Sequence, residues 1–181
     1  MVDTARSLAA LLVLLADNVS EDISPQDVRD MLVSLHPAHG GIAVTTPVET
    51  SITDANWTPI AGVWDLNALT DDYFGEAGNG QLQYSGSPPA RIATVTGTIS
   101  PASAVKDREF EFAIAKNGTV LNDSIIGSWF TVATTPRSVT VQALVDMSTN
   151  DYVSLMVRGI TSTTTNITAD YANLQAMAHI T

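Results

Sequence analysis

The chain has 181 residues, which is enough for one domain with a sizeable core and a short appendage. Its 8 Lys and Arg residues against 19 Asp and Glu residues give a net charge of −11, which argues against nucleic acid and anionic membranes as partners because both bind basic faces. The absence of cysteine excludes disulfides, thiol catalysis and cysteine-based zinc sites, so packing or assembly must stabilise the fold.

Residues 1–22 form a leucine-rich arm. Its apolar run, from Leu8 to Ala16, is too short to span a bilayer, which needs about 20 apolar residues. An apolar helix must be buried, so we expect the arm to pack against copies of itself or against a partner protein. A secretory signal and an arm folded back on its own β domain are the alternatives. The leucines expected to make the contact are Leu8, Leu11, Leu12 and Leu15.

A capped helix is predicted within residues 23–44. Ser24 is a good N-cap residue, and Pro25 suits the first helical position. Pro37 and the glycine pair at 40–41 are expected to end the helix, with extended chain following. One face of the helix is apolar and continues the contact surface of the arm, through Val28, Met31, Leu32 and Leu35.

The run from residue 11 to residue 44, and above all ISPQDVRDMLVSL at 23–35, resembles a segment near the N-termini of tailed-bacteriophage virion proteins. In fibre and head-decoration components this segment precedes a β-rich domain. The resemblance implies attachment to the virion, through the major capsid protein or another virion component, and it implies no catalytic role.

Two histidines, His36 and His39, flank the end of the predicted helix. A threefold axis could bring such a pair together around a metal ion, but Pro37 interrupts the helix that would align them and no carboxylate stands at ligand spacing. Surface or capping histidines are the preferred interpretation, and no metal site is assigned.

Residues 45–69 are predicted to be an extended linker or a first strand, with two tryptophans close together. Burial in a core or an interface is the preferred interpretation of these tryptophans. The alternative is a platform that stacks on the sugar rings of a host surface glycan. The residues considered for that contact are Trp57, Trp64 and Trp129.

Residues 70–181 show the period-two alternation of a β body. Apolar residues alternate with threonines in 91–100 and with other residues, including two glutamates, in 109–114. Asn117-Gly118 predicts a type I′ hairpin turn. Short strands separated by turn signals indicate an antiparallel β-sandwich or jelly roll, with further strands expected near 82–86, 125–133, 139–145, 151–158 and 173–180.

The order of these strands resembles the jelly roll of C1q and tumour-necrosis-factor-like proteins, a resemblance that implies a homotrimer packed around a threefold axis. In the last strand, Leu174, Ala176, Ala178 and Ile180 are expected to face the core. Met177 and His179 then lie on the opposite face, which we expect to form the trimer interface. A chain with 45% hydrophobic and only 15% charged residues is consistent with burial between subunits.

No catalytic motif or cofactor-binding loop is present in the sequence, and no cofactor is expected. Asp71, Asp72, Glu76 and Asn79 offer oxygen ligands for a calcium ion, but their spacing differs from an EF-hand and a solvated turn is preferred. A glycoside hydrolase with carboxylates distant in sequence is the third functional alternative.

The sequence therefore predicts a mainly β protein in three parts: a helical anchor and joint (1–44), an extended linker or first strand (45–69) and a jelly roll (70–181). The expected function is that of a non-enzymatic phage structural protein, a trimeric capsid decoration, cement or head-fibre protein on the surface of the virion head. The alternative is a tail-associated protein that binds a host surface glycan.

Overall fold

The computed structural model describes residues 13, 25–35, 37–53, 55–68, 70, 73–86, 91–160 and 164–179. The leucines predicted to contact a partner in the arm, Leu8, Leu11, Leu12 and Leu15, lie outside the described residues, and so do His36, Asp71, Asp72 and Ile180. Of the side chains within elements, those of Leu35 and His179 are also outside the description.

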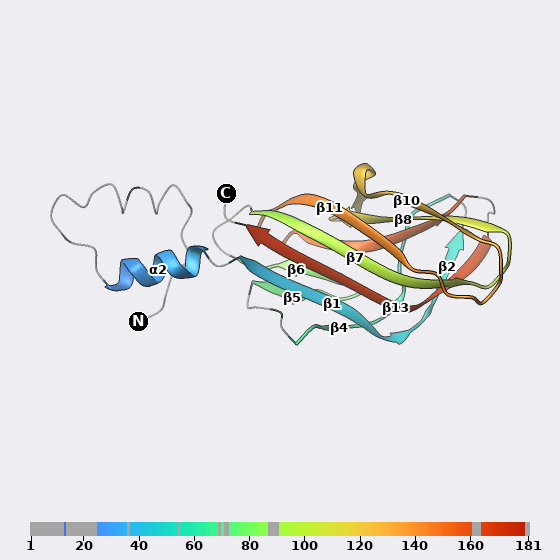
Figure 1. Ribbon diagram of the computed structural model, residues 1–181, viewed down its shortest axis with the longest axis horizontal. Coiled ribbons are helices and arrows are strands. Elements are labelled where there is room, and N and C mark those ends of the chain that lie inside the picture. Colours follow the sequence, from blue (N-terminus) through green and yellow to red (C-terminus); the bar gives the residue numbers. More distant parts are fainter. Residues whose placement is uncertain are drawn as a thin grey trace.

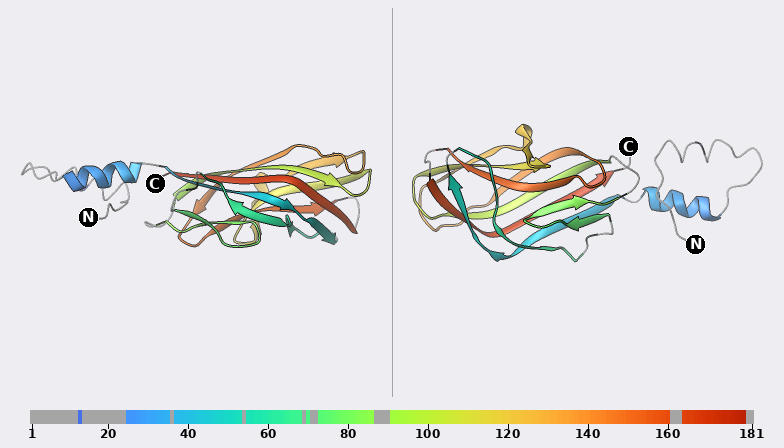
Figure 2. Two further views of the ribbon diagram at one scale, coloured as in Figure 1. Left: turned by 90° about the horizontal axis from the view of Figure 1, so that it is seen from below. Right: turned by 180° about the vertical axis from the view of Figure 1, so that it is seen from behind.

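Helix α2 (Pro25–Leu35) begins at the predicted proline and carries an acidic residue, Asp27, in its first turn. The helix lies beyond one end of the β-sandwich, beside the start of strand β1 (Figures 1 and 2). Val28 and Leu32 are one helical turn apart, and 42% and 61% of their surfaces are exposed. The apolar face predicted for this helix is therefore open to a partner.

The remaining elements of the described residues are strands in two antiparallel sheets and one short 3₁₀ helix, η1 (Asn122–Ser124). Sheet A has the order β11-β7-β13-β1-β4, and β2 pairs with a further part of β13. Its strands are β1 (Ala38–Pro47), β2 (Glu49–Thr53), β4 (Gly62–Leu66), β7 (Arg91–Ser103), β11 (Val139–Met147) and β13 (Thr164–His179).

Sheet B has the order β10-β8-β12-β6-β5, with β3 paired to β12 and β9 paired to β8. Its strands are β3 (Thr58–Pro59), β5 (Phe74–Glu76), β6 (Gln81–Tyr84), β8 (Arg108–Lys116), β9 (Thr119–Val120), β10 (Ile126–Phe130) and β12 (Tyr152–Gly159). The two sheets stack face to face as a sandwich (Figures 1 and 2). A sandwich hides one face of each sheet, which is why the strands read apolar at every second residue.

The core follows the predicted alternation. Val95 and Ile99 of β7, and Phe110 and Phe112 of β8, are buried between the sheets. Phe110 packs edge-on against Phe130, with ring centroids 5.4 Å apart. In the last strand the three described residues predicted to face inwards are also buried, namely Leu174, Ala176 and Ala178.

The hairpin predicted at Asn117-Gly118 joins β8 to β9. The φ angles are 50° at Asn117 and 77° at Gly118, as a type I′ turn requires. The final strand is longer than predicted and begins at Thr164, because Thr165, Ile167 and Ala169 continue the inward alternation.

We predicted that the glycine pair at 40–41 would help to end a helix, and this prediction is wrong. Both residues lie inside β1, which begins at Ala38, within the segment predicted to be the joint. The reason is steric: a Cβ on Gly40 would lie 2.3 Å from Phe74 Cβ, so only glycine allows β5 to approach β1 so closely. Residues 45–66, predicted to be a linker or first strand, supply the end of β1 and strands β2 to β4.

Candidate interaction face

The outward face of sheet A is uncharged across its central strands. The central strands of this sheet are β7, β13 and β1. No Asp, Glu, Lys or Arg occurs among their described outward residues within three stretches, 92–100, 171–177 and 39–43. They are Ile92, Thr94, Thr96, Thr98, Ser100, Tyr171, Asn173, Gln175, Met177, His39, Gly41 and Ala43.

Charged residues lie around this face instead. Asp65 and Asp146 stand on β4 and β11, the two edge strands of sheet A. On sheet B, Arg158 forms an ion pair with Glu111, with 2.5 Å between Arg158 Nη2 and Glu111 Oε2. In a chain of net charge −11, an uncharged face is the surface that can be buried without stripping water from ions.

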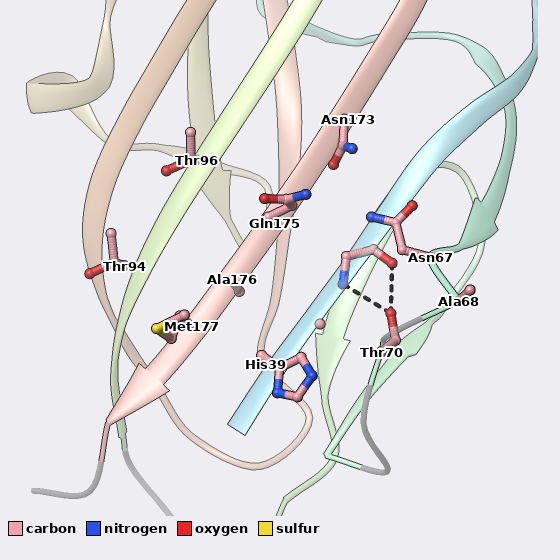
Figure 3. A pocket seen from close by; sticks show the side chains of 12 residues that line it. His39, Asn67, Ala68, Thr70, Thr94, Thr96, Asn173, Gln175, Ala176 and Met177 are labelled. Carbon is pink, nitrogen blue, oxygen red and sulfur yellow. Dashed lines mark hydrogen bonds between the residues drawn. The ribbon is translucent and has the colours of Figure 1, made fainter. Parts of the chain in front are cut away.

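A groove of about 690 Å³ lies on this face, between β13 and three described residues after β4, namely Asn67, Ala68 and Thr70 (Figure 3). Two of these residues, Asn67 and Thr70, bind the backbone of β1 at Gly41. Asn67 N donates to Gly41 O at 2.8 Å, and the Thr70 hydroxyl both accepts from Gly41 N (3.1 Å) and donates to Gly41 O (3.0 Å). A Cβ on Gly41 would lie 2.4 Å from Asn67 Nδ2, so a larger residue there would displace the Asn67 side chain.

The groove is lined by neutral polar groups and a few apolar ones. Amides come from Asn67, Asn173 and Gln175, and hydroxyls come from threonines of β7 and from the segment after β4. Met177 and His39 face each other across the β13–β1 pair at the end of the groove nearest to α2 (Figures 1 and 3). This chemistry suits hydrogen bonding with an uncharged partner surface.

The strand register places two exposed apolar residues of this face, Leu144 and Met177, in one row. Leu144 of β11 lies opposite Thr94 of β7, Thr94 lies opposite Met177 of β13, and Met177 lies opposite His39 of β1. Leu144 is 69% exposed and Met177 is 48% exposed. Met177 was predicted to lie opposite the core, and the structure places it there. His179, its predicted companion, pairs through its backbone with Ile92.

The three tryptophans occupy different environments; the preferred prediction of burial is confirmed at Trp64, and the alternative of a glycan contact there is wrong. Trp64 is buried in the core and its Nε1 donates to Ile60 O at 3.4 Å, so it has no free ring face for a sugar. Its indole packs where Gly80 leaves room, because a Cβ there would lie 2.7 Å from the ring. Trp57 holds the Arg158 guanidinium 4.7 Å above its ring, whereas Trp129 is 45% exposed on β10.

Of the residues considered for calcium, Glu76 and Asn79 lie in the described part of the chain, and Asp71 and Asp72 lie outside it. In the described part, Glu76 Oε1 accepts a hydrogen bond from Gly78 N at 2.9 Å and Asn79 has a φ of 55°, which together form a turn. Within the described residues, no three His, Asp or Glu side chains gather closely enough to hold a metal ion. No helix in the same part of the chain is long and apolar enough to cross a membrane.

The groove was not predicted from the sequence. Asn67 and Thr70 read as linker residues, and Gln175 as a neutral residue of the last strand. Their spatial relation depends on strand β1, which pairs with both β4 and β13. The glycine pair was the available signal, because adjacent glycines inside a strand indicate close approach on both faces.

No protein-family model and no curated protein matches the sequence. Among solved structures, the Eiger TNF of S. frugiperda is similar at 13% identity and a TM-score of 0.50, over 81% of this chain and 94% of that one. The chain folds as a C1q/TNF-like jelly roll. The chain is also similar to the globular domain of zebrafish complement 1qA protein, at 12% identity and a TM-score of 0.43, over 78% of this chain and 96% of that one. A third similar structure is GITRL from bushbaby, at 10% identity and a TM-score of 0.35, over 78% of this chain and 96% of that one.

Proposed function

We propose that this chain is a non-enzymatic structural protein of a bacteriophage virion, a homotrimer that decorates the surface of the head as a cement or head-fibre protein. The observation that carries the proposal is the outer face of sheet A, which is uncharged on its central strands and includes three exposed apolar residues, Ile92, Leu144 and Met177. The resemblance of residues 11–44 to phage attachment segments supplies the virion context.

Self-association through this face explains the distribution of charge. Each copy adds −11, so a trimer requires its carboxylates to remain in water while neutral surface is buried. Burying one methionine side chain contributes roughly 1.5 to 3 kcal/mol per subunit. Met177 is 48% exposed in one copy, so its burial supplies about half of this amount, and the surrounding amides and hydroxyls can pair across the interface.

Helix α2 supports attachment to the particle. Val28 and Leu32 present an apolar stripe to solvent at the end of the sandwich where β1 begins (Figure 1). Met31, on the same predicted stripe, is half-buried. Together with the apolar arm, this stripe is the surface that we assign to docking on the major capsid protein or another virion component.

Binding to particles tests this assignment. The full-length protein with Val28→Asp and Leu32→Asp should remain trimeric but lose at least tenfold in affinity for particles that lack it, in a co-sedimentation assay. Val132→Asp is the matched control, because Val132 is 56% exposed between β10 and β11, on the sandwich. Unchanged binding of the α2 variant would refute the docking surface, and failure of the wild-type protein to bind particles would refute the virion role.

A tail-associated protein that binds a host surface glycan is the second candidate, and the exposed ring of Trp129 favours it. Aromatic rings stack on sugar faces, and a 45% exposed tryptophan on an edge strand has a free surface for that contact. A glycan array tests it: specific micromolar binding that Trp129→Ala abolishes would favour this candidate over a purely structural role.

A further inference from the structure

Three basic residues gather at the end of the sandwich opposite α2, where β7 ends and β8 begins (Figure 1). Lys106 lies in the connection between β7 and β8, Arg108 begins β8, and Arg137 lies in the connection between β10 and β11. These two connections and Arg108 carry three positive charges against the single negative charge of Asp107. This local excess of positive charge contrasts with the net charge of −11 of the whole chain.

The three cations are unpaired within the described part of the chain. On sheet B, by comparison, Arg158 forms an ion pair with Glu111. Among the described residues, no carboxylate lies within ion-pair distance of Lys106, Arg108 or Arg137. An anion can therefore bind to these side chains without displacing a carboxylate of the protein itself.

Arg108 also has a buried donor that the fold does not use. Its Nη1 donates to Asp107 O at 3.1 Å, but its Nε is buried and has no acceptor among the described residues. A buried donor without an acceptor is costly, and the cost is larger for a charged group. The structure therefore holds a guanidinium N–H for which the described chain supplies no acceptor.

Phe130 lies between the two arginines. Arg108 and Phe130 are opposite each other in the β8–β10 pair, so their side chains share one face of sheet B. The Arg137 guanidinium lies 5.9 Å from the centroid of the Phe130 ring, and its Nη2 donates to Thr131 Oγ1 at 3.2 Å. Two guanidinium groups from different connections are therefore held beside the same ring.

The end of β7 holds both connections in place. Arg137 N donates to Pro101 O at 3.0 Å, and Thr134 N donates to Ser103 O at 2.8 Å. On the other connection, the Ser103 hydroxyl donates to Val105 O at 2.7 Å and accepts from Val105 N at 3.2 Å. These hydrogen bonds fix the backbone that carries the basic side chains, so less ordering is required when a ligand binds.

We infer that this end of the sandwich binds a tetrahedral oxyanion, a phosphate or sulfate group, between Arg108 and Arg137 with Lys106 at the rim. Guanidinium groups bind such oxyanions through parallel N–H···O bonds, and each of the two arginines uses one of its five side-chain N–H donors within the protein. A tetrahedral anion accepts from donors in several planes, whereas the two oxygens of a carboxylate lie in one. The anion can be the free ion or an ester on a saccharide. The inference is independent of the proposed virion role and of the trimer.

Titration calorimetry on the full-length protein provides the first test. Inorganic phosphate and glucose 6-phosphate should each bind saturably at one site per chain, and glucose should not bind. Arg137→Gln should weaken the binding of both phosphates about tenfold or more, because hydrogen bonds to a charged group are lost. Arg158→Gln is the matched control. It changes the net charge equally but lies in the ion pair with Glu111, so phosphate binding should not change.

A second readout follows the Nε–H group of Arg108 itself. In a proton–nitrogen correlation spectrum of the wild-type protein, its signal should shift when inorganic phosphate is added. The signal is assigned through the backbone or by its loss in Arg108→Lys. The Arg158 Nε–H signal should not shift, because this group already donates to Glu111 Oε2 at 2.6 Å. Circular dichroism verifies that the Arg137→Gln and Arg158→Gln proteins fold.

The outcomes decide both the site and the source of the anion. Tighter binding of glucose 6-phosphate than of inorganic phosphate assigns the site to a phosphate ester, and binding that is no tighter assigns it to the free ion. The inference is overturned if neither phosphate binds saturably, if glucose binds as well as its phosphate, if Arg137→Gln weakens binding no more than Arg158→Gln does, or if the Arg108 signal does not shift. The proposed function is measured separately, by binding to particles.

Discussion

Replacing Asp151 by asparagine is expected to lower the free energy of unfolding by about 1.5 kcal/mol at neutral pH. The Asp151 carboxylate joins the β8–β9 hairpin to the turn between β11 and β12. It accepts hydrogen bonds from Asn117 Nδ2 at 2.7 Å and from Ser148 N at 2.8 Å, and Lys116 Nζ lies 2.8 Å from its Oδ2. The Lys116 ammonium also donates to Asp146 O.

The magnitude follows from what asparagine can retain. Its single amide oxygen keeps one of the two hydrogen bonds, and the ion pair with Lys116 is lost. Hydrogen bonds to charged groups contribute about 1.5 to 3 kcal/mol against roughly 1 for neutral ones, and exposed ion pairs contribute about 0.2 to 1. Because 27% of Lys116 and 17% of Asp151 side-chain surface is exposed, solvent screens part of this energy. About 1.5 kcal/mol remains.

The pH dependence has a defined sign. Burial raises the pKa of Asp151, but hydrogen bonds from Lys116, Asn117 and Ser148 and the charge of Lys116 outweigh it, so the pKa lies below its ordinary value. A depressed folded-state pKa stabilises the fold above the unfolded-state pKa, which is about 3.9 for aspartate. The stabilisation is then lost as pH falls through the folded-state pKa.

Urea unfolding of Asp151→Asn and the wild type at pH 7 and at pH 3 checks both statements. The free energy of unfolding of the wild type should exceed that of Asp151→Asn by about 1.5 kcal/mol at pH 7 and by less at pH 3. Asp123→Asn is the control, since Asp123 is exposed in η1, and its effect should stay within about 0.5 kcal/mol. Equal stabilities of wild type and Asp151→Asn at pH 7, or a difference that grows toward pH 3, would refute the reasoning.

Two further predictions concern glycines that the packing requires. Gly97→Ala should destabilise the protein by about 1 to 3 kcal/mol in urea unfolding, because the new Cβ would lie 2.3 Å from Leu155 Cδ2. Adding Leu155→Val should recover part of the loss. If the effects of the two substitutions on the free energy of unfolding simply add, this contact is not the cause. Gly118→Ala should cost about 1 to 2 kcal/mol because φ is 77° at the hairpin, whereas Gly127→Ala in β10 should not show this penalty; equal losses would contradict the conformational explanation.

Much of the candidate site depended on features that local sequence does not encode. The groove is formed by residues about 110 apart in the chain, Asn67 and Gln175, which approach because β1 pairs with both β4 and β13. Leu144 reads as one apolar residue in an alternating strand, and only the register shows that it shares a row with Met177. Burial of Trp64 likewise depends on the space above Gly80.

The sequence by itself determined the elements that depend on interactions between residues close together in the chain. Proline at the first helical position, Pro25, predicted the start of α2, Asn117-Gly118 predicted the hairpin, and alternation in β7, β8 and β13 predicted which residues face the core. These features depend on backbone preferences and on the period of side chains along one strand. The glycine pair at 40–41 and the charge-free face were decided by tertiary structure, because strand neighbours determine close approach and the composition of a face, and these neighbours are far apart in sequence.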